Sequence, residues 1–367
     1  MKKIYLLFTT ALLFISNIAR ADEGMWLLSL LEKLNYKDMQ AKGLRLTPEQ
    51  LYSVNNSSLK DACIWFNGGC TGELISSEGL ILTNHHCGYD AIAELSNVQD
   101  NILDNGFWAK TKSEERKPVT PMSITRVVRV DDVTEAVLAK LSGVAEKDRG
   151  IKLQEIFKEL GKKATEGTHY EYTGREMFKG NAYYLFVMEK FTDIRLVGTP
   201  PQNIGKFGGE TDNWMWPRHT GDFSMFRVYA NKDNKPAEYS AENVPYKPLH
   251  YLPVSLKGVK EGDFAMIIGF PGRTNRYEFS QGVALATDVV DPNIVNLRAI
   301  RLEAWKEQMV MDEDTRLKLS SDYAGIANYW KYFDGEAEQL KHNKVYDKKT
   351  AEEKAFAKWA ENRDEYK

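Results

Sequence analysis

The stretch from Cys70 to Cys87 constrains the fold more than any other part of this 367-residue sequence. It predicts two apolar strands, at 71–76 and 80–84, joined by a glycine-containing turn. The second strand runs into the triplet His85-His86-Cys87. A histidine fixed at the end of a strand has the geometry that a general base requires. A disulfide between Cys70 and Cys87 would close the loop behind this histidine, and the loop-entropy estimate gives it a stabilisation of roughly 3 kcal/mol.

Similar apolar runs, bounded by Gly, Pro or Asn, predict further strands along the chain. They lie at 124–130, 170–172, 183–188, 194–198, 222–229, 251–255 and 263–269. Helical patterns lie at 25–34, 89–96, 133–141 and 146–163. Another helix is expected to begin at the capping box Thr47-Pro48-Glu49-Gln50. The sequence therefore predicts a mostly β fold, a barrel or a sandwich, with helical insertions.

The composition changes after Pro271-Gly272. The strand patterns stop there, and charged helical patterns take over at 294–311, 313–331 and 350–362. About 345 mature residues suit two domains, which we place at 22–274 and 275–367. The sequence ends in a charged helical run without a cap, so we expect the second domain to be the start of a larger helical domain.

The first 21 residues predict a secretory signal peptide. Two lysines precede an apolar run from Ile4 to Ile18, and Ala19-Arg20-Ala21 offers a small-x-small cleavage site. The alternative is an uncleaved membrane anchor, but the run is short and interrupted by polar residues. We therefore expect an exported protein in a compartment where disulfides can form.

The composition argues against nucleic acid and membrane surfaces as partners. The chain has 49 basic and 52 acidic residues, a net charge of −3, and its lysines and arginines are spread along its length. Its three cysteines are Cys63, Cys70 and Cys87, too few for a disulfide scaffold. Cys63 is then either a free buried thiol or a competitor for Cys70.

Two other interpretations of the histidine pair remain open on the residues alone. His85 and His86 with a neighbouring cysteine suggest a metal site, but the sequence has no second cluster at ligand spacing. Adjacent residues on a strand also point to opposite faces, so the two rings would not share one ion. The remaining interpretation is a purely structural histidine pair.

The surrounding pattern favours catalysis. Cys70, Gly72-Glu73-Leu74-Ile75, an apolar strand and Thr83-Asn84-His85-His86-Cys87 together resemble the segment around the catalytic histidine of chymotrypsin-like proteases. That resemblance makes His86 the general base and places His85 on the opposite face of the strand. Asp222, at the start of a predicted strand, resembles the aspartate that orients such a base. The alternative for Asp222 is a turn-forming acid at the entrance of the strand.

No serine in this sequence has the Gly-x-Ser-Gly setting in which backbone N–H groups form an oxyanion hole. Ser224 lies within a predicted strand, and Ser280, Ser320 and Ser321 lie in predicted helices or the turns between them. We therefore expect the nucleophilic serine beyond residue 367. The chain by itself is then expected to be inactive.

Longer motifs resemble one family, the bacterial periplasmic dipeptidyl peptidases of the dipeptidyl-peptidase 7 and 11 type. The motifs are Gly24-Met25-Trp26, Asn67-Gly68-Gly69-Cys70-Thr71-Gly72, Thr83 to Gly88, Gly209 to Phe223 and Gly269 to Thr274. The resemblance implies a chymotrypsin-like double β-barrel whose second barrel carries a large inserted helical domain. It also implies release of dipeptides from peptides with a free N-terminus, no cofactor or metal, a homodimer, and a location in the periplasm or on the cell surface of a Gram-negative bacterium.

The same resemblance assigns residues. It implies that His86 is the base and Asp222 its partner, and that Asn213, Trp214 and Asn328 hold the substrate's α-amino group. An ammonium ion needs fixed oxygen acceptors and tolerates an aromatic face. The alternative for Asn213 and Trp214 is a structural turn.

Two rival functions remain. One is a non-catalytic peptide-binding protein that kept the barrel and lost the serine. The other is a metal-dependent hydrolase that uses His85, His86 and Asp222.

Overall fold

The computed structural model describes residues 25–272 and 274–366, so the expected signal peptide at 1–21 lies outside the described residues. Within these residues ten strands form one sheet, and every strand pair is antiparallel. The strands are β1 (Cys63–Phe66), β2 (Cys70–Leu74), β3 (Leu80–Thr83), β4 (Phe107–Trp108), β5 (Ile124–Asp132), β6 (Glu171–Met177), β7 (Ala182–Phe191), β8 (Asp193–Thr199), β9 (Ser224–Ala230) and β10 (Val244–Pro245).

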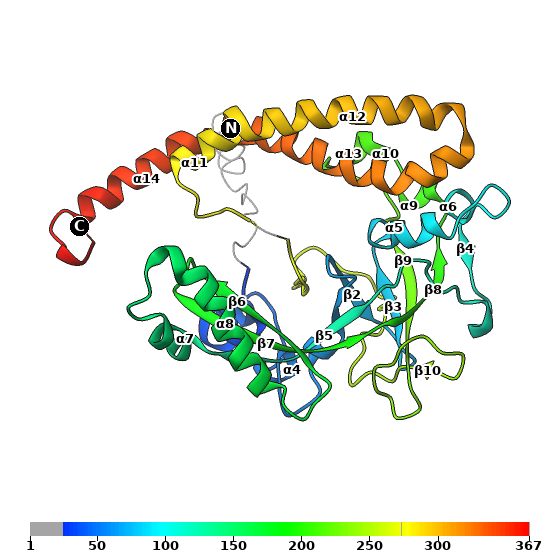
Figure 1. Ribbon diagram of the computed structural model, residues 1–367, viewed down its shortest axis with the longest axis horizontal. Helices are drawn as coiled ribbons and strands as arrows, with labels where there is room; N and C mark the ends of the chain where they lie inside the picture. Colours follow the sequence, from blue (N-terminus) through cyan, green and yellow to red (C-terminus); the bar gives the residue numbers. More distant parts are fainter. Residues whose placement is uncertain (1–24, 273, 367) are drawn as a thin grey trace, which may run out of the picture.

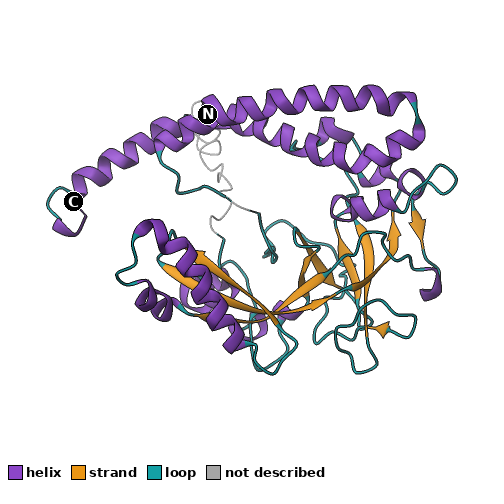
Figure 2. Cartoon of the chain, in the orientation of Figure 1, coloured by secondary structure: helices purple, strands orange, loops and turns teal. Residues whose placement is uncertain are grey.

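The sheet is open, with the strand order β4-β8-β9-β3-β2-β1-β5-β7-β6, and β10 also pairs with β9. It runs from β6 and β7 on one side of the molecule to β4 on the other (Figures 1 and 2). The order places β3 beside β9, although about 140 residues separate them. This non-local pair determines where the candidate site forms.

Helices cover parts of the sheet and make up the C-terminal region. They are α2 (Leu31–Leu34), α3 (Tyr36–Ala41), α4 (Pro48–Leu51), α5 (His85–Glu94), α6 (Ile102–Asn105), α7 (Thr134–Leu141), α8 (Glu146–Ala164), α9 (Gln202–Gly205), α10 (Gly209–Asp212), α11 (Ser280–Leu285), α12 (Asp291–Met311), α13 (Glu313–His342) and α14 (Val345–Ala360). Helices α12 and α13 form a long hairpin above α5 (Figure 1). In the described part of the chain no helix is both long and apolar enough to cross a membrane.

The main hydrophobic core joins the sheet to α5 and to the helical hairpin. Phe66 and Phe226 are fully buried and lie with their ring centroids 5.1 Å apart. Ile92 of α5 and Leu317 of α13 belong to the same buried cluster. The hairpin is therefore docked on α5, which lies between it and the sheet, through apolar contacts, the main favourable term in folding.

Most predicted elements are present. The capping box forms as expected, because the Thr47 side chain accepts from the Gln50 N–H and the Gln50 side chain accepts from the Thr47 N–H. The helices predicted at 133–141, 146–163 and 294–311 correspond to α7, α8 and α12. The pattern at 313–331 is part of the longer α13.

The strands predicted at 251–255 and 263–269 are wrong. Neither segment has strand structure. The Leu252 N–H donates to the Leu74 carbonyl at 2.8 Å, and Phe270, directly after the second segment, donates its N–H to Thr71 Oγ1 at 2.8 Å. A strand needs a continuous ladder with a neighbour, and these are isolated bonds to β2.

A pair of glycines lets α8 pack directly on β6. A Cβ atom on Gly161 of α8 would lie 2.1 Å from the Tyr172 ring, and one on Gly174 of β6 would lie 2.1 Å from the Phe157 ring. Each glycine thus leaves room for an aromatic ring of the opposite element. Gly150 of the same helix has no atom within 4 Å of such a Cβ.

We expect Gly161→Ala to lower the free energy of unfolding by roughly 1–3 kcal/mol, because the added methyl group has no space. Gly150→Ala is the matched control and should stabilise the protein by roughly 0.5–1 kcal/mol, since alanine favours a helix. Denaturant unfolding of both variants measures the difference. Equal effects at the two positions would contradict the described packing.

Candidate active site

The pairing of β3 with β9 creates the candidate active site. The two strands are antiparallel, with Thr83 opposite Ser224. The residues that follow Thr83 therefore meet the residues that precede Ser224 at one edge of the sheet. In this way Asp222 lies beside His86, which is 136 positions away in the sequence.

The carboxylate of Asp222 binds three groups of the segment that follows β3. The backbone N–H of His86 donates to Oδ1 at 2.9 Å, and ring atom Nδ1 of His86 lies 2.7 Å from Oδ2. The side-chain amide of Asn84 donates to Oδ2 and to the Asp222 carbonyl, each at 3.2 Å. The sequence analysis gave Asn84 no role of its own, because its bond to Asp222 spans 138 positions and no local pattern indicates it.

The expectation that both histidines end a strand is wrong. The strand stops at Thr83, and α5 begins at His85. The first N–H groups of a helix have no acceptor within it, and Asp222 supplies one for His86. A carboxylate at a helix N-terminus is also favoured by the helix dipole. The histidine ring is therefore positioned by a helix cap from Asp222, which lies just before the distant strand β9.

The electrostatics of the pair suit a base and its partner. Burial acts to raise the pKa of Asp222, but the hydrogen bonds and the charge of His86 outweigh burial and hold that pKa below its usual value. Asp222 is thus an anion that accepts a hydrogen bond from the Nδ1–H group, which leaves Nε2 of His86 as the proton acceptor. The His86 side chain is 68 % exposed, so Nε2 is accessible to a substrate.

His85 is buried, whereas the neighbouring His86 is exposed. It is 1 % exposed, and neither ring nitrogen has a hydrogen-bond partner in the described structure. Its ring contacts the edge of Tyr89, and a Cβ atom on Gly205 would come within 2.5 Å of it. Burial lowers the pKa of His85 to about 4, so its ring is neutral near pH 7. This residue packs the site and has no access to a substrate.

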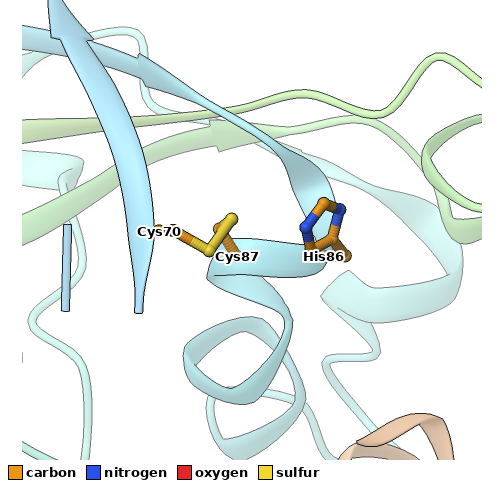
Figure 3. A group of neighbouring side chains, drawn as sticks. All are labelled: Cys70, His86 and Cys87. Atoms are coloured by element: carbon orange, nitrogen blue, oxygen red, sulfur yellow. A yellow bond between two sulfur atoms is a disulfide. The ribbon is translucent and has the colours of Figure 1, made fainter. Parts of the chain in front are cut away.

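Cys70 and Cys87 form a disulfide with a sequence separation of 17 residues. Figure 3 shows it bridging β2 and the first turn of α5, with the His86 ring nearby. Potential ligand atoms of Cys70, His86 and Cys87 lie within 4.8 Å of one another. Sulfur in a disulfide is not the thiolate that binds zinc, so this group does not fit a metal while the bridge is intact. Cys63 is free and buried, and burial raises its pKa to about 12.

The serines of the described residues do not complete a triad. Ser224 is fully buried, and its hydroxyl donates to the Asn84 carbonyl at 2.8 Å. Ser280 donates to Glu353, and Ser320 to the Leu317 carbonyl. Ser321 donates to Asp90. Within residues 25–272 and 274–366, no serine hydroxyl bonds to the His86 ring.

The three residues expected at the substrate's amino group lie together. Asn213 Nδ2 donates to Asn328 Oδ1 at 2.9 Å, and Trp214 Nε1 donates to the Asn328 carbonyl at 3.1 Å. Asn213 and Trp214 follow α10, and Asn328 belongs to α13. The side-chain oxygen of Asn213 remains as an acceptor, and Trp214 is 57 % exposed.

The low pKa of His85 predicts acid sensitivity. The pKa of this histidine is 6.5 in the unfolded chain and about 4 in the folded chain. Between these two pH values the unfolded chain therefore binds a proton that the folded chain excludes. As the pH falls through this window, His85 should therefore cost the fold up to about 3 kcal/mol. Urea unfolding at several pH values should show His85→Phe gaining stability relative to the unmodified chain as the pH falls. A difference that does not change with pH would contradict the neutral, buried ring.

Comparisons with known proteins identify the family. The model of the peptidase S46 family matches residues 21–367. The chain is 49% identical over 369 residues to a dipeptidyl-peptidase 7 of Capnocytophaga gingivalis, an alignment that covers 100% of this chain and 52% of that protein. It is 48% identical over 334 residues to an Asp/Glu-specific dipeptidyl-peptidase of the same organism, which covers 91% of this chain and 47% of that protein.

A solved structure has a similar fold. Porphyromonas endodontalis DPP11 in complex with the dipeptide Arg-Asp superposes with a TM-score of 0.88 at 39% identity, over 94% of this chain and 50% of that one. The mixed fold of open sheet and helices is thus shared with that structure. The chain spans about half the length of the curated relatives it matches. The chain belongs to the peptidase S46 family.

Proposed function

We propose that this chain is part of a serine-type dipeptidyl peptidase, in which His86 is the general base and Asp222 is its orienting partner. The observation that carries the proposal is the 2.7 Å contact between His86 Nδ1 and Asp222 Oδ2, which leaves Nε2 free to take a proton. Relatives named as dipeptidyl peptidases support the same function.

The proposed reaction is a two-step acyl transfer. A serine hydroxyl attacks the carbonyl carbon of the second peptide bond while His86 Nε2 takes its proton. His86 then gives that proton to the departing amine, and water hydrolyses the acyl-enzyme by the same route. Asp222 stabilises the imidazolium that forms in each step. We place the serine and its oxyanion hole beyond residue 367.

Asn213, Trp214 and Asn328 are proposed to bind the substrate's free amino group. The Asn213 side-chain oxygen and the Trp214 ring provide an acceptor and an aromatic face for an ammonium ion. An anchor at a fixed distance from the catalytic base would place the second peptide bond at the serine. Dipeptides are then the product.

The remaining features of the proposal concern architecture and location. The sheet and its helices at 22–274 would form the first barrel and the start of the second barrel of a chymotrypsin-like catalytic domain. Residues 275–367 would begin an inserted helical domain, in agreement with the helices from Ser280 to Ala360. We further propose export by the segment 1–21, a periplasmic or surface location in a Gram-negative bacterium, and a homodimer. The Cys70–Cys87 disulfide supports an oxidising compartment.

We expect His86→Ala to lower kcat/KM more than about a thousandfold in the product of the complete reading frame, because no other group replaces the base. Stability should change little, since the side chain is 68 % exposed. Hydrolysis of a fluorogenic dipeptide substrate measures the rate, with His342→Ala at the end of α13 as the matched control. The chain ending at Lys367 should release no dipeptide.

A rate within a few-fold of the unmodified enzyme in His86→Ala would contradict the assignment of the base. Dipeptide release by the 367-residue chain alone would contradict the placement of the serine. Absence of a Gly-x-Ser-Gly segment downstream of residue 367 would instead support a non-catalytic peptide-binding protein.

A further inference from the structure

One face of α13 holds the segment that carries Asn213 and Trp214. Asn328, Lys331 and Tyr332 occupy positions i, i+3 and i+4, which share one face of a helix. Asn328 bonds to Asn213 and Trp214, and the Tyr332 ring lies 5.2 Å from the Trp214 ring. Lys331, between them, is the charged residue of the set, and the sequence analysis gave it no role.

Lys331 binds the backbone of α10, the short helix that directly precedes Asn213 and Trp214, the proposed amine anchor. Its ammonium group donates to the carbonyls of Glu210, at 2.7 Å, and of Thr211. The last carbonyls of a helix receive no hydrogen bond from N–H groups of the same helix. A lysine there can donate to them and interacts favourably with the helix dipole. Because α10 has four residues, these two bonds fix much of its C-terminal end.

The anchor needs such support because its backbone is strained. Trp214 has a φ angle of +60°, in the left-handed region that residues with a side chain rarely adopt. Such a conformation persists only where the surrounding structure determines it. The contacts that restrain Trp214 from outside its own loop come from the same face of α13.

The docking of α13 on the rest of the protein does not depend on Lys331. At the other end of the helix, Leu317 lies in the main core and Arg316 forms an ion pair with Asp104. Ser321 also bonds to Asp90 of α5. Removing the Lys331 charge should therefore leave the helix in place and release only the segment at 210–214.

We propose that Lys331 is a positioning residue for recognition of the substrate's α-ammonium group. Its bonds to α10 hold Asn213 and Trp214 in the orientation that binds this group, and they thereby set the distance from the amino terminus to the cut. This inference rests on the proposed dipeptidyl peptidase function.

The first test follows Trp214 directly. The protein is labelled with 5-fluorotryptophan, and comparison with Trp214→Phe assigns the fluorine resonance of Trp214. The same resonance is then recorded in Lys331→Met, Lys331→Arg and Lys318→Met. Lys331→Met should shift or broaden this resonance, whereas arginine, which can donate to both carbonyls, should retain it. Lys318 of the same helix pairs with Asp314 and is the matched control. An unchanged resonance in Lys331→Met would overturn the inference.

The second test uses kinetics in the product of the complete reading frame. Lys331→Met should raise KM for a free-amine dipeptide substrate about tenfold with kcat within about twofold, and Lys331→Arg should restore much of the affinity. Partial unfolding would instead lower kcat and leave KM unchanged, because fewer molecules would be active. That pattern, or an unchanged KM, would overturn the inference.

An N-acetylated form of the same substrate separates this inference from the proposed function. If the unmodified enzyme cleaves both forms equally well, the ammonium anchor itself is wrong, and the role of Lys331 in recognition falls with it. If the enzyme requires the free amine and Lys331→Met keeps the original KM, the function stands and the inference about Lys331 fails.

Discussion

The carboxylate of Asp222 is the group on which the candidate site depends. It caps the first turn of α5 through the His86 N–H, binds the His86 ring, and accepts from the Asn84 amide. One partly buried anion thus fixes where the helix begins and how the imidazole is oriented. The pair forms because β3 and β9 are antiparallel neighbours, so the end of one strand meets the start of the other.

Helix α13 contacts the region proposed to bind the substrate's amino group. The long helix α13 is docked by Leu317 and Arg316 at one end, and farther along it contacts the segment of Asn213 and Trp214. The same hairpin also contacts α5, whose first turn carries His86. One helix therefore contacts both the segment of the proposed amine anchor and the helix that carries the proposed base. A set distance between the two is what the proposed dipeptide release requires.

Short patterns predicted the Cys70–Cys87 pair and the capping box at Thr47, and the structure contains both. The resemblance to a known family pointed to His86 and Asp222; the structure places their side chains 2.7 Å apart, and their catalytic roles stay a prediction. The helix start at His85 was missed because its cap comes from Asp222, far away in the chain. Strands were wrongly predicted at 251–255 and 263–269 because apolar alternation does not reveal whether a pairing neighbour is available. The role of Lys331 depends on a contact between α13 and α10 that no local pattern encodes.

The hydrogen bond between His86 and Asp222 is measured most directly by proton NMR of the 367-residue chain. A proton held between an imidazole nitrogen and a carboxylate is strongly deshielded. His169 Nε2 lies 2.6 Å from Glu189 Oε1, so this second pair should give a resonance of the same kind that persists in every variant of His85, His86 and Asp222. We expect a separate far-downfield resonance that disappears in His86→Gln and in Asp222→Asn and persists in His85→Phe and in His169→Gln. The absence of a resonance that depends on both His86 and Asp222 would contradict the pairing on which the proposed base depends.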